Sequence, residues 1–157
     1  MDYQTILERV HAAVKPLIGS GKVASYIPEL AKVSPDQFGI AIVDLEGRVY
    51  QAGDAEIPFS IQSISKLFGL TLAFHLEGDS VWSRVGREPS GTPVNSLVQL
   101  EQERGRPRNP FINAGAIAVA DRLLSQAGDA KAQILALLSS LCREPIRIDA
   151  EVAQSEA

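Results

Sequence analysis

The pattern of apolar and polar positions changes within the first third of the chain, from a helical repeat to a continuous apolar run. Residues 3–19 repeat apolar side chains at helical spacing. The run 38–43 is continuously apolar, and the turn pair Glu46-Gly47 separates it from a return strand at Val49. The pattern therefore predicts a helix followed by an antiparallel β-hairpin.

Two apolar faces in this part of the chain are expected to be buried. The face of the first helix expected to point inward carries Ile6, Val10, Ala13, Val14 and Leu17. The apolar run 38–43 is typical of a strand whose sheet is covered on both faces. Few other strands are predicted, so either helices alone cover the hairpin or part of the sheet is missing. The ending IRIDAEVAQSEA stops on a helix-like pattern, which favours a fragment of a longer polypeptide.

Helical patterns dominate from residue 61 onward. Residues 61–76 are apolar around most of the helix circumference, which predicts a buried helix. Ser60 is its predicted N-cap, Phe59 is expected to pack on Ile64, and Gly78 marks its end. Three more helices are predicted, over Leu97 to Glu103, Asn113 to Gln126 and Ala130 to Leu141.

Composition narrows the class of protein. The 157 residues suit one domain, with 45% hydrophobic and 22% charged residues. The net charge of −4 argues against a nucleic-acid or anionic-membrane surface. The start MDYQTILERVHAAV is not a secretory signal, and no run approaches the 18 or so apolar residues of a membrane span. A single cysteine, Cys142, excludes an internal disulfide, so a cytoplasmic protein is expected.

A serine and a lysine three positions apart, Ser63 and Lys66, stand at the start of the predicted helix 61–76. Residues at this spacing lie on one face of a helix. An apolar setting favours the neutral amine of a lysine, which can take the proton of a serine hydroxyl without a histidine. The first helical turn also offers backbone N–H groups to a developing oxyanion. The spacing alone leaves a second interpretation open, a lysine that reaches solvent beside a capping serine.

The other reactive side chains offer no competing site. His75 is twelve residues beyond Ser63, about 18 Å along one helix, which is too far for a base. Two isolated histidines and one cysteine have no recognisable metal-ligand spacing, so no metal is expected. Cys142 follows an apolar helical pattern and is expected in the core.

Five segments between residues 21 and 124 are long enough to compare with known families: GKVASYIPELAKV, FGIAIVDLEGRVYQAGD, PFSIQSISK, VGREPSGTPVNSLVQLE and RPRNPFINAGAIAVADRLL. They resemble the bacterial serine-dependent glutaminases, which share their fold with serine β-lactamases and penicillin-binding proteins. The resemblance implies an α+β, β-lactamase-like fold of the Ser-x-x-Lys hydrolases. It implies an incomplete one, with the N-terminal helix, two antiparallel strands and most of the helical subdomain.

The resemblance also implies an activity, the hydrolysis of L-glutamine to L-glutamate and ammonia without a metal or organic cofactor. Ser63 matches the nucleophile that forms a γ-glutamyl ester, and Lys66 matches the paired base. Asn113, in FINAGA, matches a substrate-binding asparagine whose amide can donate and accept. Glu156, in QSEA, matches a glutamate that holds the substrate, and Gln62 is included as the neighbour of the nucleophile. The family is tetrameric, so a homo-oligomer is expected.

Two local features refine this comparison. The loop REPSGTPVNS is typical of the family, and Pro93, Asn95 and Ser96 are expected to shape the rim of the site or the entry to a helix. Gly69 stands where the family commonly has threonine. Glycine at that position is expected to weaken the helix by up to about 1 kcal/mol.

Length is the largest departure from the family, whose chains are about twice as long. Residues 1–157 are therefore expected to be the N-terminal part of a single glutaminase domain whose C-terminal half is absent. Residues 1–60 would hold the helix and hairpin of an α/β subdomain, and residues 61–157 the nucleophile helix and the helical subdomain. Two alternatives stay open: an inactive or partner-dependent fragment of such an enzyme, and another Ser-x-x-Lys acyl-transfer hydrolase.

Overall fold

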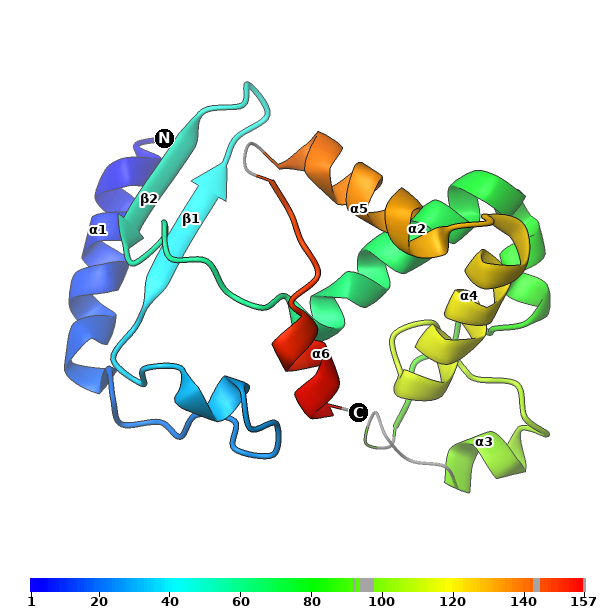
Figure 1. The fold of residues 1–157 in the computed structure, drawn as a ribbon. Helices are drawn as coiled ribbons and strands as arrows, with labels where there is room; N and C mark the ends of the chain where they lie inside the picture. The colour runs from blue at the N-terminus through cyan, green and yellow to red at the C-terminus, as the bar shows by residue number, and fades with distance from the viewer. Residues whose placement is uncertain (92, 94–97, 143–144, 157) are drawn as a thin grey trace. The chain divides into compact units, whose positions relative to one another are not determined.

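The computed structural model describes residues 1–91, 93, 98–142 and 145–156. The chain divides into two compact units, which are described separately. The first unit comprises residues 1–60 and 148–157, and the second unit comprises residues 61–147. Figure 1 shows the chain coloured from its N-terminus to its C-terminus.

The first unit begins with helix α1 (Tyr3–Val14). The carboxylate of Asp2 accepts hydrogen bonds from the Thr5 backbone N–H at 3.1 Å and from the Thr5 hydroxyl at 2.6 Å. A side-chain acceptor at this position satisfies an amide that the first helical turn leaves without a backbone partner. The chain continues as a 3-10 turn over Lys15–Leu17. The helix predicted over residues 3–19 is confirmed, except that its last turn is a 3-10 turn rather than an α-helical one.

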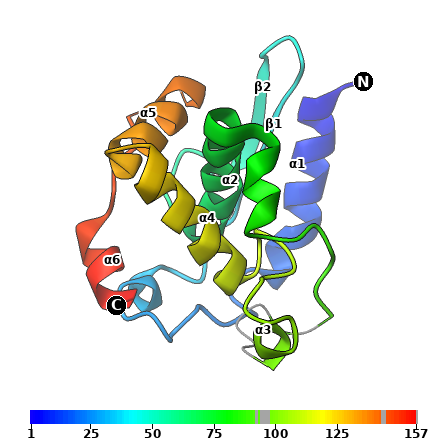
Figure 2. The same ribbon diagram turned by 90° about the vertical axis from the view of Figure 1, so that its right-hand side faces the viewer.

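The predicted hairpin is also confirmed. Strands β1 (Gly39–Val43) and β2 (Val49–Gly53) pair antiparallel. In the connecting turn, the Asp44 carboxylate accepts hydrogen bonds from the Arg48 backbone N–H at 2.9 Å and from its guanidinium group at 2.7 Å. Figures 1 and 2 show α1 lying along the hairpin.

Burial of α1 differs from the sequence prediction. Leu7, at 1% exposed, is the buried residue of this helix, whereas Ile6 and Val10 are exposed. The helix carries two apolar stripes, and the hairpin covers the stripe that passes through Leu7. The predicted apolar face is therefore buried only in part: Val14 is half-buried, whereas Ile6 and Val10 are exposed, because the packing partner decides which side of a helix is buried.

The two strands alternate between half-buried and exposed residues. Ile42 and Tyr50 share the half-buried face, and the Tyr50 ring lies 5.4 Å from that of Tyr3 on α1. Val43 and Val49 on the other face are exposed. In the part of the chain that the structure describes, α1 packs on one face and the sheet has two strands. Part of the sheet was expected to be missing, so cover on both faces of a complete sheet stays a prediction.

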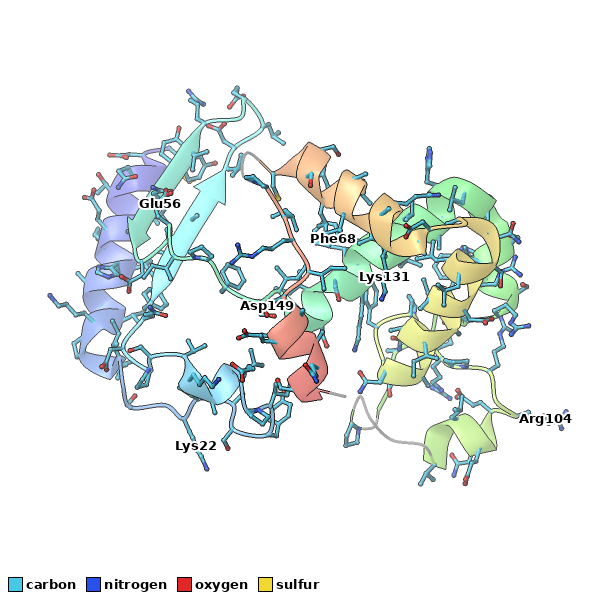
Figure 3. The ribbon with its side chains drawn as sticks, viewed as in Figure 1. Lys22, Glu56, Phe68, Arg104, Lys131 and Asp149 are labelled. Atoms are coloured by element: carbon cyan, nitrogen blue, oxygen red, sulfur yellow. The ribbon has the colours of Figure 1, made fainter. Side chains whose placement is uncertain are left out.

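Helix α6 (Ala150–Glu156) completes the first unit. The carboxylate of Asp149, labelled in Figure 3, accepts hydrogen bonds from the backbone N–H groups of Glu151 and Val152, both at 3.1 Å. These bonds satisfy the first amides of the helix. The helix-like pattern at the end of the sequence is therefore confirmed as a capped helix.

The second unit is built from helices. Helix α2 (Ser65–Glu77) packs against α4 (Asn113–Gln126) and α5 (Ala130–Leu141), as Figures 1 and 2 show. A short helix, α3 (Val98–Gln102), precedes α4. The core between the helices consists of Leu72, Ala73, Val81, Val85, Val119, Leu123, Ala127 and Ala130. The sequence predicted α4 and α5 with the correct ends, and α3 ends at Gln102, one residue before the predicted end.

Helix α2 is less buried than its apolar composition predicts. Leu72 and Ala73 are its buried residues, whereas Leu67 and Phe74 are exposed. Helices α4 and α5 cover the side of α2 that carries the buried pair. The prediction of a helix buried all round is wrong for the described residues, because an apolar circumference does not state how many neighbours pack on it.

Gly69 offers a test of helix stability inside α2. A Cβ atom added there would come no closer than 4.0 Å to a neighbouring side chain, the methyl group of Leu123. Glycine loses more backbone freedom than alanine in a helix. We expect Gly69→Ala to raise the free energy of unfolding by up to about 1 kcal/mol, measured by urea denaturation followed by circular dichroism. A lower urea midpoint than that of the wild type would contradict the open space around Gly69.

Glu77, the last residue of α2, forms an ion pair with Arg122 on α4. Its carboxylate accepts hydrogen bonds from the Arg122 Nε at 2.9 Å and from the second guanidinium nitrogen, and its side chain is 7% exposed. The Ser80 hydroxyl donates a further hydrogen bond at 3.0 Å. The hydrogen bonds from Arg122 lower the pKa of Glu77 below its ordinary value of 4.5. The stabilisation is therefore fully present above pH 4.5 and is lost as the pH falls through the lowered pKa.

A Glu77→Gln variant should reveal this pH dependence. We expect the free energy of unfolding to fall more steeply for the wild type than for Glu77→Gln as the pH drops below 4.5. Urea denaturation at a series of pH values measures both curves. Glu101→Gln, which changes an exposed acid on α3, is the matched control and should follow the wild type. Parallel curves for wild type and Glu77→Gln would contradict the role assigned to Arg122.

Candidate functional site

Ser63 lies in a 3-10 turn, Gln62–Ile64, that leads directly into α2. Its side chain is exposed, and its hydroxyl has no hydrogen-bond partner among the residues that the structure describes. The α-helix begins at Ser65, whose hydroxyl donates to the Gln62 carbonyl at 2.6 Å. The predicted helix start after Ser60 is wrong, because this tighter turn intervenes. Ser63 still stands next to the amino-terminal end of α2, where the helix dipole favours negative charge.

Gln62 has an unusual backbone. Its φ of 45° lies in the left-handed region, which residues other than glycine rarely adopt. Such strained residues persist where the surrounding structure fixes them, and they cluster at functional sites. The left-handed residue thus sets the path of the chain immediately before Ser63.

Lys66 joins α2 to the start of α4. Its Nζ donates hydrogen bonds to the side-chain Oδ1 of Asn113 at 2.7 Å and to the backbone carbonyl of Phe111 at 3.1 Å. Lys66 is half-buried, and both acceptors are neutral oxygens. The amine is therefore held by protein groups, which differs from the geometry of a lysine that reaches only solvent.

The structure brings two of the predicted site residues into direct contact and places a third one helical turn away. Asn113 is the first residue of α4, and its side chain binds Lys66. Ser63 precedes Lys66 by three residues in the turn that enters α2. The described residues include no hydrogen bond between Ser63 Oγ and Lys66 Nζ. The lack of this hydrogen bond does not by itself exclude a candidate base, because such bonds often tighten only when a substrate binds.

Two contributors to this arrangement were missed by the sequence reasoning. The Phe111 carbonyl binds Lys66, and a backbone carbonyl carries no side-chain signal. Asn109 bonds the backbone at the start of α4, accepting from Phe111 N–H at 3.0 Å and from Ile112 N–H at 3.2 Å. The pair Asn109-Pro110 just before a helical pattern is a signal that could have predicted this turn.

Glu156, Pro93, Asn95 and Ser96 are the remaining residues that the sequence predicts for the site. Glu156 is an exposed residue of α6 in the first unit, so its place beside the substrate stays a prediction. Pro93 is exposed. Asn95 and Ser96, predicted to shape the rim of the site, lie outside the described residues.

The part of the chain that the structure describes holds no group of three or more His, Cys, Asp or Glu side chains that could bind a metal ion. It also contains no helix with the length and apolar character needed to cross a membrane. Cys142 is exposed as a free thiol at the end of α5, so its predicted core position is wrong. The buried face of α5 passes through Leu138 instead.

Fold and site together define a class of protein: an α+β chain with a Ser-x-x-Lys sequence at the entrance of a helix, its lysine held by an asparagine from a second helix. The family model described as Glutaminase matches residues 21–157. The chain belongs to the glutaminase family.

Relatives of known sequence agree with this assignment. A glutaminase of Rhizobium leguminosarum bv. trifolii is 58% identical over 99% of this chain and 51% of its own length. A glutaminase of Rhizobium rhizogenes is 56% identical over 99% of this chain and 51% of its own length. The chain spans about half the length of the curated relatives it matches.

Solved structures show the same coverage. The probable glutaminase YbaS superposes with a TM-score of 0.90 and 36% sequence identity, covering 98% of this chain and 50% of that protein. A probable glutaminase from Bacillus subtilis complexed with 6-diazo-5-oxo-L-norleucine superposes with a TM-score of 0.78 and 30% identity, covering 99% and 47%. The predicted α+β class and the resemblance to glutaminases are confirmed, whereas the relation to β-lactamases and the division into subdomains stay predictions.

Proposed function

We propose that this chain supplies the nucleophile side of a glutaminase active site, which hydrolyses L-glutamine to L-glutamate and ammonia. The observation that carries the proposal is the contact between Lys66 and Asn113, at 2.7 Å, inside the segment matched by the family model. That contact joins a candidate base, Lys66, to a candidate substrate-binding residue, Asn113, close in sequence to the exposed Ser63.

In the proposed reaction, Ser63 Oγ attacks the carbonyl carbon of the glutamine side-chain amide. A C–O bond forms, the carbonyl oxygen gains negative charge, and the C–N bond then breaks to release ammonia and leave a γ-glutamyl ester. Water attacks this ester and restores the Ser63 hydroxyl with release of glutamate. The amino-terminal end of α2 supports the developing oxyanion through its dipole.

Lys66 is the proposed base. A neutral lysine amine has two N–H bonds and one lone pair. Its two acceptors, the Phe111 carbonyl and Asn113 Oδ1, match the two N–H bonds. The lone pair is then left to take the Ser63 proton, which the resulting ammonium group passes to the leaving amide nitrogen.

Three residues besides Ser63 are proposed to bind glutamine. Because Asn113 Oδ1 already accepts from Lys66, the Nδ2 group is what Asn113 offers to the substrate, as a donor to a carboxylate or carbonyl oxygen. Glu156 is proposed to hold the α-ammonium group by charge. Gln62 adjoins Ser63 in the same turn and is proposed to line the site.

The ligand of the Bacillus subtilis relative suggests a probe for this site. In 6-diazo-5-oxo-L-norleucine a diazo ketone replaces the side-chain amide of glutamine. We expect Ser63 Oγ to bond to the diazo carbon, which takes up the hydroxyl proton as N₂ leaves. The product is a stable ether on Ser63.

A comparison of substrates tests the proposed function. Ammonia release is measured with L-glutamine and with L-asparagine, and ring opening is measured with a β-lactam. The assay uses this chain and a glutaminase fusion, in which residues 1–157 are joined to the second half of the Rhizobium rhizogenes relative. We expect the fusion to hydrolyse glutamine and to leave the β-lactam intact. Hydrolysis of the β-lactam but not glutamine would instead assign the site to another Ser-x-x-Lys acyl-transfer hydrolase.

A second candidate is a chain that acts only with a partner. The coverage of about half of each relative favours it, because the second half of those proteins has no counterpart among the matched residues. Turnover by the fusion without turnover by residues 1–157 alone would support this candidate. Equal turnover by both would exclude it.

Assembly as a homotetramer and a cytoplasmic location are also proposed. Two exposed apolar residues, Ile117 and Leu124, are seven positions apart on one face of α4, which suits a contact between copies. Native mass spectrometry measures the number of copies in the assembly.

A further inference from the structure

Asn109 makes three hydrogen bonds through its side chain. Its Oδ1 accepts from the backbone N–H groups of Phe111 and Ile112, and its Nδ2 donates to the Glu88 carbonyl at 2.9 Å. This arrangement is an asparagine turn, in which a side chain satisfies the amides ahead of a helix. Asn109 thereby uses both ends of its amide and orders the segment that enters α4.

The bond to Ile112 N–H has a direct consequence for Lys66. The Phe111 carbonyl and the Ile112 N–H belong to one peptide unit, which is planar and trans, so the two groups point in opposite directions. Asn109 Oδ1 fixes the N–H end of this unit at 3.2 Å, and Lys66 Nζ binds the carbonyl end at 3.1 Å. Orienting one end of the peptide therefore orients the other.

Close packing holds the backbone of Asn109 against α4. A Cβ atom at Gly115 would lie 1.8 Å from the Asn109 carbonyl oxygen, so only glycine allows this approach. Pro110 and Ile112 are buried. The position of Asn109 relative to the first turn of α4, which begins with Asn113, is thus closely defined.

A second segment of the chain, residues 86–88, is hydrogen-bonded to the residues just before Asn109. Gly86 N–H donates to the Pro107 carbonyl at 2.7 Å, and Glu88 N–H donates to the Arg108 carbonyl at 3.0 Å. A Cβ atom at Gly86 would lie 2.5 Å from the Arg108 carbonyl oxygen. Residues 86–88 therefore run beside residues 107–109, and the Nδ2 bond of Asn109 closes this pairing.

We infer that Asn109 is a positioning residue, which aims the Phe111 carbonyl and the first turn of α4 so that two oxygens hold the Lys66 amine. The inference rests on the proposed function for its catalytic meaning. Among the described residues the Asn109 side chain has no hydrogen bond to Ser63 or Lys66, and it acts through the backbone between residues 111 and 113.

Chemical labelling of lysines tests this inference without any substrate. Acetic anhydride acetylates exposed amines, and peptide mass spectrometry gives the rate at each lysine. Lys131 is exposed on α5, and the exposed Lys22 points away from the chain in Figure 3, so both serve as references within the same molecule. We expect Lys66 to react more slowly than either reference in the wild type. Asn109→Ala should raise the relative rate at Lys66 about fivefold, because an acceptor of its amine is displaced.

Two further variants separate positioning from general loss of structure. Asn109→Asp keeps an oxygen for Phe111 N–H and Ile112 N–H, so it should retain most of the protection of Lys66. Arg122→Ala removes the ion pair with Glu77 at the far end of α2, so it should lower thermal stability without raising the rate at Lys66. The thermal unfolding temperature of every variant is measured as well, so that labelling rates at Lys66 are compared between variants of similar stability.

The inference is overturned if Asn109→Ala leaves the relative rate at Lys66 unchanged, or if Arg122→Ala raises it equally. Failure of both Asn109→Ala and Asn109→Asp to fold would also overturn it, because Asn109 would then determine the fold rather than the placement of Lys66. In the glutaminase fusion, the alanine variant should lower kcat with little change in KM. The labelling result does not require turnover, so failure of the proposed function would be recognised separately.

Discussion

Replacing Ser63 by alanine is expected to abolish ammonia release from glutamine in the glutaminase fusion. The loss should reach about a thousandfold or more, because the variant has no oxygen with which to form the γ-glutamyl ester. Ser63 is exposed in a turn before α2, so its removal should leave the fold intact. Ammonia release measures the activity, and circular dichroism checks the fold.

Ser65 provides the matched control for this variant. It is also exposed and lies two residues from Ser63, but its hydroxyl donates to the Gln62 carbonyl at 2.6 Å. Ser65→Ala should therefore keep most of the turnover. Loss of turnover in Ser65→Ala with retention in Ser63→Ala would exchange the two assignments and contradict the proposed mechanism.

Replacing Lys66 by methionine should lower turnover by about a thousandfold, which is the typical effect of removing a general acid–base group. The methionine side chain fills similar space but cannot accept the Ser63 proton. It also leaves Asn113 Oδ1 and the Phe111 carbonyl without their shared donor. Steady-state kinetics of the fusion measures the effect, which should appear mainly in kcat.

Lys66→Arg distinguishes a base from a fixed positive charge. Arginine keeps the charge and the donors for Asn113 and Phe111, but it does not lose its proton in proteins. We therefore expect Lys66→Arg to lose as much turnover as Lys66→Met. Substantial turnover in Lys66→Arg would assign Lys66 an electrostatic role and contradict its role as the base.

Helices α4 and α5 were predictable because local signals mark their ends. Asn113 follows Pro110, and the Gly128-Asp129 pair separates α4 from α5, with Asp129 capping the Ala132 N–H at 3.0 Å. The start of α2 was not predictable in the same way. A serine before an apolar run is typical of an N-cap, but the chain inserts a 3-10 turn with a left-handed residue, Gln62.

Burial was harder to predict than secondary structure. Both α1 and β1 carry apolar residues on two sides, and only the packing partner decides which side is covered. On α1, which packs against the hairpin, Leu7 is buried and Ile6 is exposed. Apolar periodicity thus predicts an element more securely than it predicts the face that packs.

The candidate site was predictable only in part. The spacing of Ser63 and Lys66 is local, so the sequence could place the two residues close together, although Ser63 lies in the turn before α2 rather than in the helix. The contact from Lys66 to Asn113 spans 47 residues and depends on how α2 packs against α4. The Phe111 carbonyl belongs to the backbone, so only the structure could assign it to Lys66.

The central claim is that Ser63 is the nucleophile for the glutamine side chain. The most direct measurement treats the fusion and its Ser63→Ala and Cys142→Ala variants with the diazo ketone analogue of glutamine, then maps the adduct by peptide mass spectrometry. Cys142 is included because it is an exposed free thiol. We expect one adduct on the peptide that contains Ser63, retained in Cys142→Ala and absent from Ser63→Ala. An adduct on another residue, or none in a fusion that hydrolyses glutamine, would contradict the account.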